Sequence, residues 1–375
     1  MFRFIIGIAL ALALTAPARS LAQPTPASND LWRRNDTGIT FTRARFSFPA
    51  RAGAVALEGA YEFSHPGQGL DSGLQYEAAD RQIFASVYVY APSLAHTGLT
   101  AFATDNAVRV QSGSDLRMLE SRTVAAGGRD GVAIRADYSG FRQARAASSA
   151  AFIRAGFWII KLRVTGPEAR RSDVEATMTA LLANLRFEGD IGPRAAEPLT
   201  VADCASRPDH AAPVLPHSGA DTLEDAVFTV SDATQTEPRH DPPGHEIGVA
   251  FGSAWCLSGR PDVGNSNLPI LRAMPYSGPN ALHSVLVGIV TDSGTTIEVV
   301  ENRERHVWIM YYHQIGSTYV LGRYGGIPTD EQIVNIISGA DRDGGRVRAT
   351  ITYPGNGDST ITINEPLTTP SSPQT

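Results

Sequence analysis

Short segments of alternating apolar and polar residues run through the first half of the chain, a pattern typical of strands with one buried face. The clearest is 157–165, where Trp158 and Val164 fall on one side and Lys161 and Arg163 on the other. We therefore expect a sheet with a single buried side. We predict strands over residues 41–48, 55–63, 82–90, 118–124, 131–138 and 157–165.

Two segments of this half have a helical spacing of apolar residues instead. A weaker one covers residues 99–110, and a stronger one follows Gly166 and Pro167. Ser172 and Glu175 have the spacing of a capping box, which predicts the start of the second helix. One face of that helix is expected to pack into the core, and its apolar residues are Val174, Met178, Leu181, Leu182 and Leu185.

The second half of the chain is predicted to be richer in strands. The expected strands are 226–230, 247–254, 285–290, 295–300, 307–312, 318–321, 347–353 and 360–363. One short helix is predicted over 330–338, with Thr329 and Gln332 as its capping box. The fold class is thus α+β: an N-terminal antiparallel sheet packed by amphipathic helices, followed by a β-rich domain with one short helix.

The chain divides at segments rich in proline and polar residues. We predict a flexible leader over 23–39, an α+β domain over 40–188, a proline-rich linker or long loop over 189–220, a β-rich domain over 221–365 and a disordered tail over 366–375.

Residues 1–22 have the pattern of a secretory signal peptide, with Arg3 before an apolar run and Ser20-Leu21-Ala22 at its end. An uncleaved anchor is the alternative, although the apolar run is about half of the roughly 20 residues that span a bilayer. We expect cleavage before Gln23, a periplasmic or secreted protein and no transmembrane segment thereafter. The formal net charge of −6 argues against nucleic acid as a partner.

The order of strands, an inner helix, further strands and a final amphipathic helix ends in the segments FWIIKLRVT (157–165) and LLANLRF (181–187). Over residues 40–188 this order resembles PsbP-like α+β domains. The resemblance implies a binding or assembly module of a larger complex rather than an enzyme. It assigns no site residue, and it does not extend to the C-terminal half.

Cys204 and Cys256 are the two cysteines of the chain. In an exported protein such a pair most simply forms a disulfide, and two separate free thiols are the alternative. A redox role is not favoured, because the chain contains no C-x-x-C motif.

Histidine and acidic residues gather between positions 203 and 246, and they suit zinc or another divalent ion. The sharpest fragment provides the candidate metal ligands His240, Asp241 and His245. Pro242 and Pro243 exclude a helix there, so the fragment is not an H-E-x-x-H site, and a solvated polar loop is the alternative. The other residues of the cluster are Asp203, Asp209, His210, His217 and Glu246.

No catalytic residue can be assigned from the sequence. His306 and His313 are seven positions apart, so on one strand they would face opposite sides of the sheet. The common hydrolase and nucleotide-binding motifs are missing. We therefore expect an exported, non-catalytic binding or accessory protein of the cell envelope, without a cofactor, whose partner is an unknown protein or small ligand. The alternatives are a metal-dependent hydrolase that uses the 203–246 cluster and a surface adhesion protein.

Overall fold

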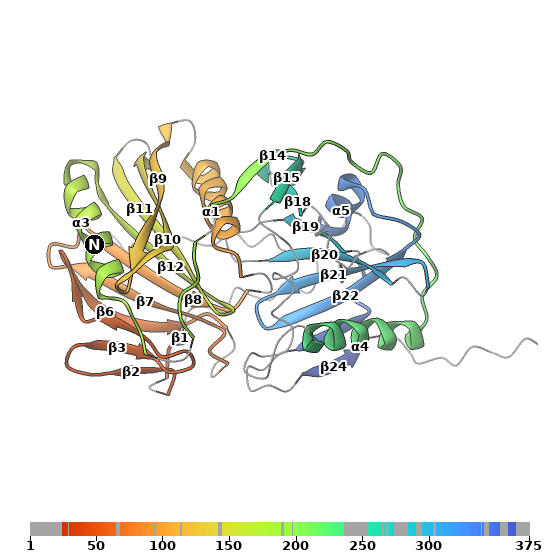
Figure 1. The fold of residues 1–375 in the computed structure, drawn as a ribbon, viewed down its shortest axis with the longest axis horizontal. Coiled ribbons are helices and arrows are strands. Elements are labelled where there is room, and N and C mark those ends of the chain that lie inside the picture. Colours follow the sequence, from red (N-terminus) through yellow and green to blue (C-terminus); the bar gives the residue numbers. More distant parts are fainter. Residues whose placement is uncertain are drawn as a thin grey trace, which may run out of the picture.

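The computed structural model describes residues 25–364 except 29, 65–67, 93–94, 113–114, 142–144, 189–190, 197, 236–253, 264–265, 268, 274–283, 290–294, 303–304, 339, 341–344 and 353–358. In this part of the chain strands predominate over helices, which confirms the β-rich character expected from the sequence. The predicted signal peptide (1–22) and tail (366–375) lie outside the described residues. Two large sheets lie side by side, one from each half of the chain (Figure 1).

The first large sheet, sheet A, is antiparallel throughout, with the order β1-β6-β7-β8-β12-β11-β10-β9 and β5 paired to β6. Its strands are β1 (Thr25–Pro26), β5 (Arg51–Ala52), β6 (Val55–Glu62), β7 (Asp71–Ala78), β8 (Phe84–Tyr90), β9 (Arg117–Ala126), β10 (Arg129–Gly140), β11 (Ala146–Ala155) and β12 (Trp158–Pro167).

A smaller antiparallel sheet, sheet B, packs against one face of sheet A. It has the order β13-β4-β3-β2, and its strands are β2 (Trp32–Arg34), β3 (Gly38–Phe41), β4 (Phe46–Pro49) and β13 (Arg186–Phe187). Buried aromatic rings join the two sheets, for example Phe41 edge-on to Trp158 with ring centroids 5.1 Å apart. Helix α3 (Arg171–Asn184) covers the same core, and its predicted apolar face is buried as expected.

The other face of sheet A is also covered, contrary to the prediction of a single buried side. Helix α1 (Thr97–Ser112) packs on β10 and β11, where Val108 is buried beside Ile134 and Phe152. On β12, Ile159 and Lys161 are as buried as the apolar residues that alternate with them. A strand can therefore carry a lysine inside the protein when a second layer covers that face.

Three predictions for the first half are wrong in detail. The strand expected over 41–48 is a hairpin, because the turn 42–45 separates β3 from β4 and holds Arg45 at φ 54°. Part of the expected flexible leader belongs to the fold, since β1 pairs with β6 and Trp32 is buried. Helix α3 has no capping box at Ser172, because the short 3-10 helix η2 (Glu168–Arg170) runs directly into it.

The second large sheet, sheet C, has the order β14-β15-β18-β19-β20-β21-β22-β23-β24, and β14 is parallel to β15 while the other neighbours are antiparallel. Its strands are β14 (Thr200–Asp203), β15 (Ala254–Gly259), β18 (Ile270–Ala273), β19 (Ser284–Ile289), β20 (Thr296–Asn302), β21 (Val307–Gln314), β22 (Ser317–Tyr324), β23 (Ala349–Thr352) and β24 (Thr360–Ile363). Two further short strands, β16 (Asp262–Val263) and β17 (Ser266–Asn267), pair with each other.

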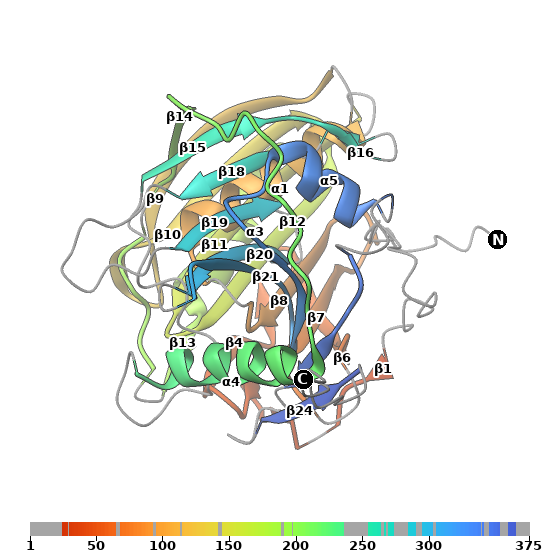
Figure 2. The ribbon, with the colours of Figure 1, turned by 90° about the vertical axis from the view of Figure 1, so that its right-hand side faces the viewer.

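The described residues of this half form two helices, whereas one was predicted. Helix α5 (Asp330–Ile337) matches the prediction, including the capping box of Thr329 and Gln332. Helix α4 (Gly219–Gln235) occupies the segment predicted as a strand over 226–230. The β-branched residues there favoured a strand, but the segment is helical, and its buried Ala226 belongs to one apolar cluster with Ile309 of β21. Figure 2 shows α4 beside β24 of sheet C. Residues 247–253 of another predicted strand lie outside the described part.

Within the described part of the chain, apolar side chains of the two halves meet at two places. In one, Leu99 and Ala103 of α1 pack against Trp255 of β15 and Leu271 of β18. In the other, Ile315, in the turn between β21 and β22, packs against Tyr90 and Ile159 of sheet A. None of the helices in the described residues has the length and apolar composition needed to cross a bilayer.

Candidate functional site

The candidate metal ligands His240, Asp241 and His245 lie outside the described residues, so the metal site stays a prediction. The described histidines of the cluster do not converge: His210 is exposed, whereas the side chain of His217 is buried beside Asp225 of α4. Among the residues that the structure describes, no group of three or more His, Cys, Asp or Glu side chains is placed to hold a metal ion.

His217 belongs to a buried ionic network that fastens α4 to sheet C. The carboxylate of Asp225, on α4, lies 3.0 Å from His217 Nε2. It also accepts hydrogen bonds from Arg323 of β22, from Nε at 2.8 Å and from Nη2 at 2.6 Å. Such a two-point contact fixes the helix in both position and orientation.

Asp221 extends this network by one turn of α4. Arg323 Nη1 donates to it at 2.6 Å, and the backbone N–H and hydroxyl of Ser218 donate at 3.0 and 2.6 Å. Burial acts to raise the pKa of Asp221, but the hydrogen bonds from Ser218 and the charge and hydrogen bond of Arg323 outweigh it and lower the pKa to about 2. The side chain therefore stays charged at any physiological pH.

A nucleophile–histidine–carboxylate arrangement spans the middle of sheet C. His313 Nε2 lies 3.0 Å from Glu298 Oε2, and His313 Nδ1 lies 2.9 Å from the hydroxyl of Thr318. Because the carboxylate can only accept, Nε2 carries the proton, and in the neutral ring Nδ1 accepts from Thr318. The order hydroxyl, imidazole, carboxylate is that of a hydrolase triad.

Strand register brings these three groups together. His313 of β21 is directly opposite Thr318 of β22, and Glu298 lies on the neighbouring strand β20, two residues beyond the position opposite His313. The exposed fractions of Glu298, His313 and Thr318 are only 4%, 1% and 2%. As it stands, the hydroxyl is closed to any substrate, and the three side chains join three strands.

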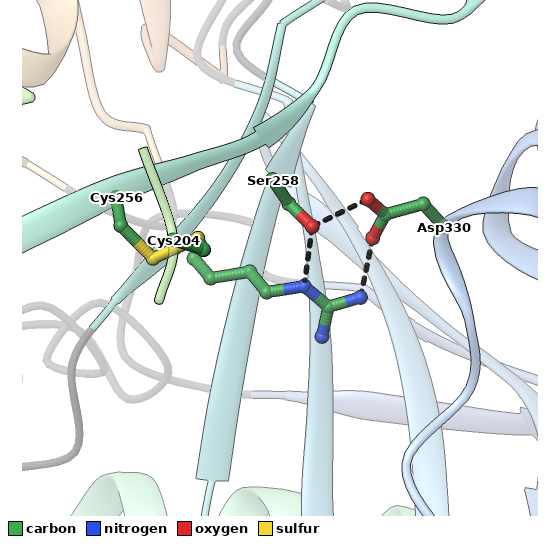
Figure 3. The surroundings of a disulfide bond; sticks show 5 residues. Cys204, Cys256, Ser258 and Asp330 are labelled. Atoms are coloured by element: carbon green, nitrogen blue, oxygen red, sulfur yellow. Dashed lines mark hydrogen bonds and ion pairs between the residues drawn. A yellow bond between two sulfur atoms is a disulfide. The ribbon is translucent and has the colours of Figure 1, made fainter. Parts of the chain in front are cut away.

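A third polar cluster lies beside the disulfide (Figure 3). Cys204 follows β14 and is bonded to Cys256 of β15, as the sequence predicted. Two residues further along β15, the hydroxyl of Ser258 accepts from Arg272 Nε at 3.1 Å and donates to Asp330 at the start of α5. The side chain of Arg272 also forms an ion pair with Asp330. The cluster thus joins two strands and a helix.

The chain's single lysine lies where sheet A meets sheet C. Lys161 is 5% exposed, and its ammonium group is 5.5 Å from the centroid of the Tyr88 ring. Tyr88 packs against the same buried cluster as Ile315, which lies in the turn between β21 and β22. Asp71 is on the same face of sheet A, because it is opposite Tyr90, two residues from Tyr88 on β8. The partly exposed acid Asp71 and the buried base Lys161 therefore share the junction of the two sheets.

The electrostatics of this junction single out Asp71. Burial raises its pKa to about 7, the positive charge of Lys161 acts against this rise, and the charge of Glu62 adds to it. Perturbed carboxyl groups gather at functional sites more often than elsewhere, although structural ion pairs also perturb them. We take the surroundings of Asp71 and Lys161 as the candidate ligand-binding position of the protein.

Sequence reasoning missed all of these clusters except the disulfide. Their members lie far apart in the chain, as with Asp225 and Arg323, or Ser258 and Asp330, and only strand order brings them together. The sequence does mark Lys161, because a lone lysine within an apolar strand is unusual. The predicted sheet with one buried side nevertheless placed this lysine on the face toward solvent.

Comparisons with known proteins add little. No protein-family model matches the chain, and no curated protein matches it. A solved crystal structure from Bacteroides thetaiotaomicron VPI-5482 is 11% identical, with a TM-score of 0.20, over 52% of this chain and 60% of that chain. The matched region thus spans less than two thirds of that protein.

Proposed function

We propose that the protein is an exported, non-catalytic binding or accessory protein of the cell envelope. The observation that carries this proposal is the burial of the Glu298–His313–Thr318 arrangement. A nucleophile must reach its substrate, and here the hydroxyl and imidazole are almost fully enclosed and bonded to each other. Groups that could do acid–base chemistry serve instead to hold strands together.

Two further observations support an exported binding protein. The disulfide between Cys204 and Cys256 is typical of proteins in oxidising compartments such as the periplasm. The resemblance of residues 40–188 to PsbP-like domains favours a role in binding or assembly. In this proposal an α+β unit around sheets A and B and a β-rich unit around sheet C each bury a core of their own, and a partner or ligand contacts the partly exposed Asp71 rather than the enclosed Lys161.

The test is a hydrolase screen with esters, peptides and phosphate esters, made on the wild-type protein and on His313→Gln. Glutamine keeps a hydrogen-bonding side chain of similar length but cannot act as the base of a triad. We expect no turnover by the wild type above that of the variant. Turnover by the wild type that is lost in His313→Gln would refute the non-catalytic proposal. The residues that enclose the Thr318 hydroxyl would then have to move to admit a substrate.

Export is tested on the same protein, recovered without a histidine tag from the periplasm of an expressing bacterium. The expected intact mass begins at Gln23 and is two hydrogens below that of the reduced chain. A mass that begins at Met1, or a reduced cysteine pair, would contradict export or the disulfide. Stoichiometric metal in this sample, lost in His240→Ala but kept in His210→Ala, would favour the metal-dependent hydrolase instead.

A further inference from the structure

Strand β9 forms one edge of sheet A, and it is long and open for an edge strand. It has ten residues, and in the described part of the chain it pairs only with β10. Seven of its residues are exposed and only Ala126 is buried. An edge of this kind presents backbone N–H and C=O groups that a further strand can pair with.

The pairing of β9 with β10 is regular over Glu120–Val124. Register shifts lie on either side, one near Met118 and one beyond Val124. Bulges of this sort, and charges, commonly protect edges from unwanted pairing. Here the central part between the two shifts is regularly paired, and its charges, Glu120 and Arg122, form an exposed ion pair within the same strand.

The order Glu120-Ser121-Arg122 complements itself under two-fold symmetry. In an antiparallel pair of identical strands, the axis passes through a residue that is opposite its own copy. An axis at Glu120 or at Arg122 would place like charges opposite each other, which is unfavourable. An axis at Ser121 places Glu120 of each copy opposite Arg122 of the other, so two cross-strand ion pairs form.

We propose that the β9 edge binds a second copy of this chain, in an antiparallel pair centred on Ser121, so that the two copies of sheet A become one continuous sheet. The three central residue pairs make a small interface. The dimer is therefore expected to be weak, with a dissociation constant in the micromolar range. This inference is independent of the proposed binding function, which concerns another part of the molecule.

Crosslinking tests the register. In the proposed pair the two Ser121 Cα atoms are about 4.5–5.5 Å apart, within the range that a disulfide spans. Ser121→Cys is therefore expected to form a disulfide-linked dimer under mild oxidation. Thr123→Cys is the matched control: it is equally exposed on the same strand, but its two copies would be about 14 Å apart, four residues along the ladder. Equal crosslinking of both variants would overturn the proposal.

Charge exchange tests the complementarity, with sedimentation velocity of the full chain over a concentration series as the measurement. Glu120→Arg places arginines opposite each other and is expected to weaken the dimer about tenfold. Adding Arg122→Glu reverses both charges and is expected to restore the wild-type dissociation constant. The dimer would be refuted if the wild-type chain stays monomeric up to about 200 μM, well above the micromolar range expected here. The register would be refuted if the double variant does not recover the wild-type dissociation constant.

Discussion

Replacing Asp71 by asparagine should stabilise the protein at neutral and alkaline pH. The carboxyl of Asp71 has a pKa of about 7 in the folded protein, against an ordinary value of 3.8. The folded chain therefore holds one more proton than the unfolded chain between about pH 4 and pH 7. Over that interval the free energy of unfolding falls as pH rises, and above pH 7 this contribution is constant.

The full shift corresponds to about 4 kcal/mol, at about 1.4 kcal/mol for each pKa unit. Because Asp71 keeps partial contact with solvent, we reduce this to about 2 kcal/mol. Asparagine resembles the neutral carboxyl in shape and polarity and has no charge to bury. Asp71→Asn should therefore equal the wild type near pH 4 and exceed it by about 2 kcal/mol at pH 8.

Equilibrium urea unfolding at constant ionic strength, followed by tryptophan fluorescence from pH 4 to pH 8, measures this difference. Glu77→Gln is the matched control, because Glu77 lies on the same strand and forms only a loose pair, at 3.6 Å, with the exposed Arg81. It should leave the pH dependence of the wild type unchanged. If Asp71→Asn is less stable than the wild type at pH 8, Asp71 is charged in the folded protein and stabilised by Lys161, and our reasoning is wrong.

Three further substitutions test the contacts that hold the second half together, each by urea unfolding. Asp225→Ala leaves the buried Arg323 without one of its two carboxylates and should cost about 3 kcal/mol, and a loss below 1 kcal/mol would show that α4 does not depend on this pair. Cys256→Ser opens a bond between residues 52 positions apart and should cost about 4 kcal/mol, while added dithiothreitol should then have no further effect. Thr329→Ala removes the hydroxyl that caps α5 and should cost about 1 kcal/mol, and an unchanged urea midpoint would show that the cap contributes nothing.

Local patterns predicted the elements whose sequence agrees with their surroundings. Helix α5 has its capping box where Thr329 and Gln332 indicated, and strand β24 has the predicted bounds. Strand β11 was missed because alanine and serine make up most of it, and neither residue favours strands by itself. It is a strand because β10 and β12 pair with it on both sides.

Helix α4 shows the opposite conflict between local preference and tertiary contacts. Val227, Phe228 and Val230 favour a strand, yet the segment is helical. Asp221 and Asp225 are four residues apart, so one helical face presents both carboxylates to Arg323. That partner lies about a hundred residues further along the chain, beyond the reach of any local pattern.

The sequence by itself determined the β-rich character of the protein, the apolar face of α3, the pairing of the two cysteines and the helix at 330–337, because each depends on neighbouring residues or on a choice between very few partners. Only the tertiary structure decided which polar residues are buried and what they contact. The positions of Lys161, Asp71 and His313 depend on strand order and on the layers that cover each sheet face. The periodicity of a strand or helix tells which of its side chains share a face, but the rest of the fold decides whether that face contacts water or protein.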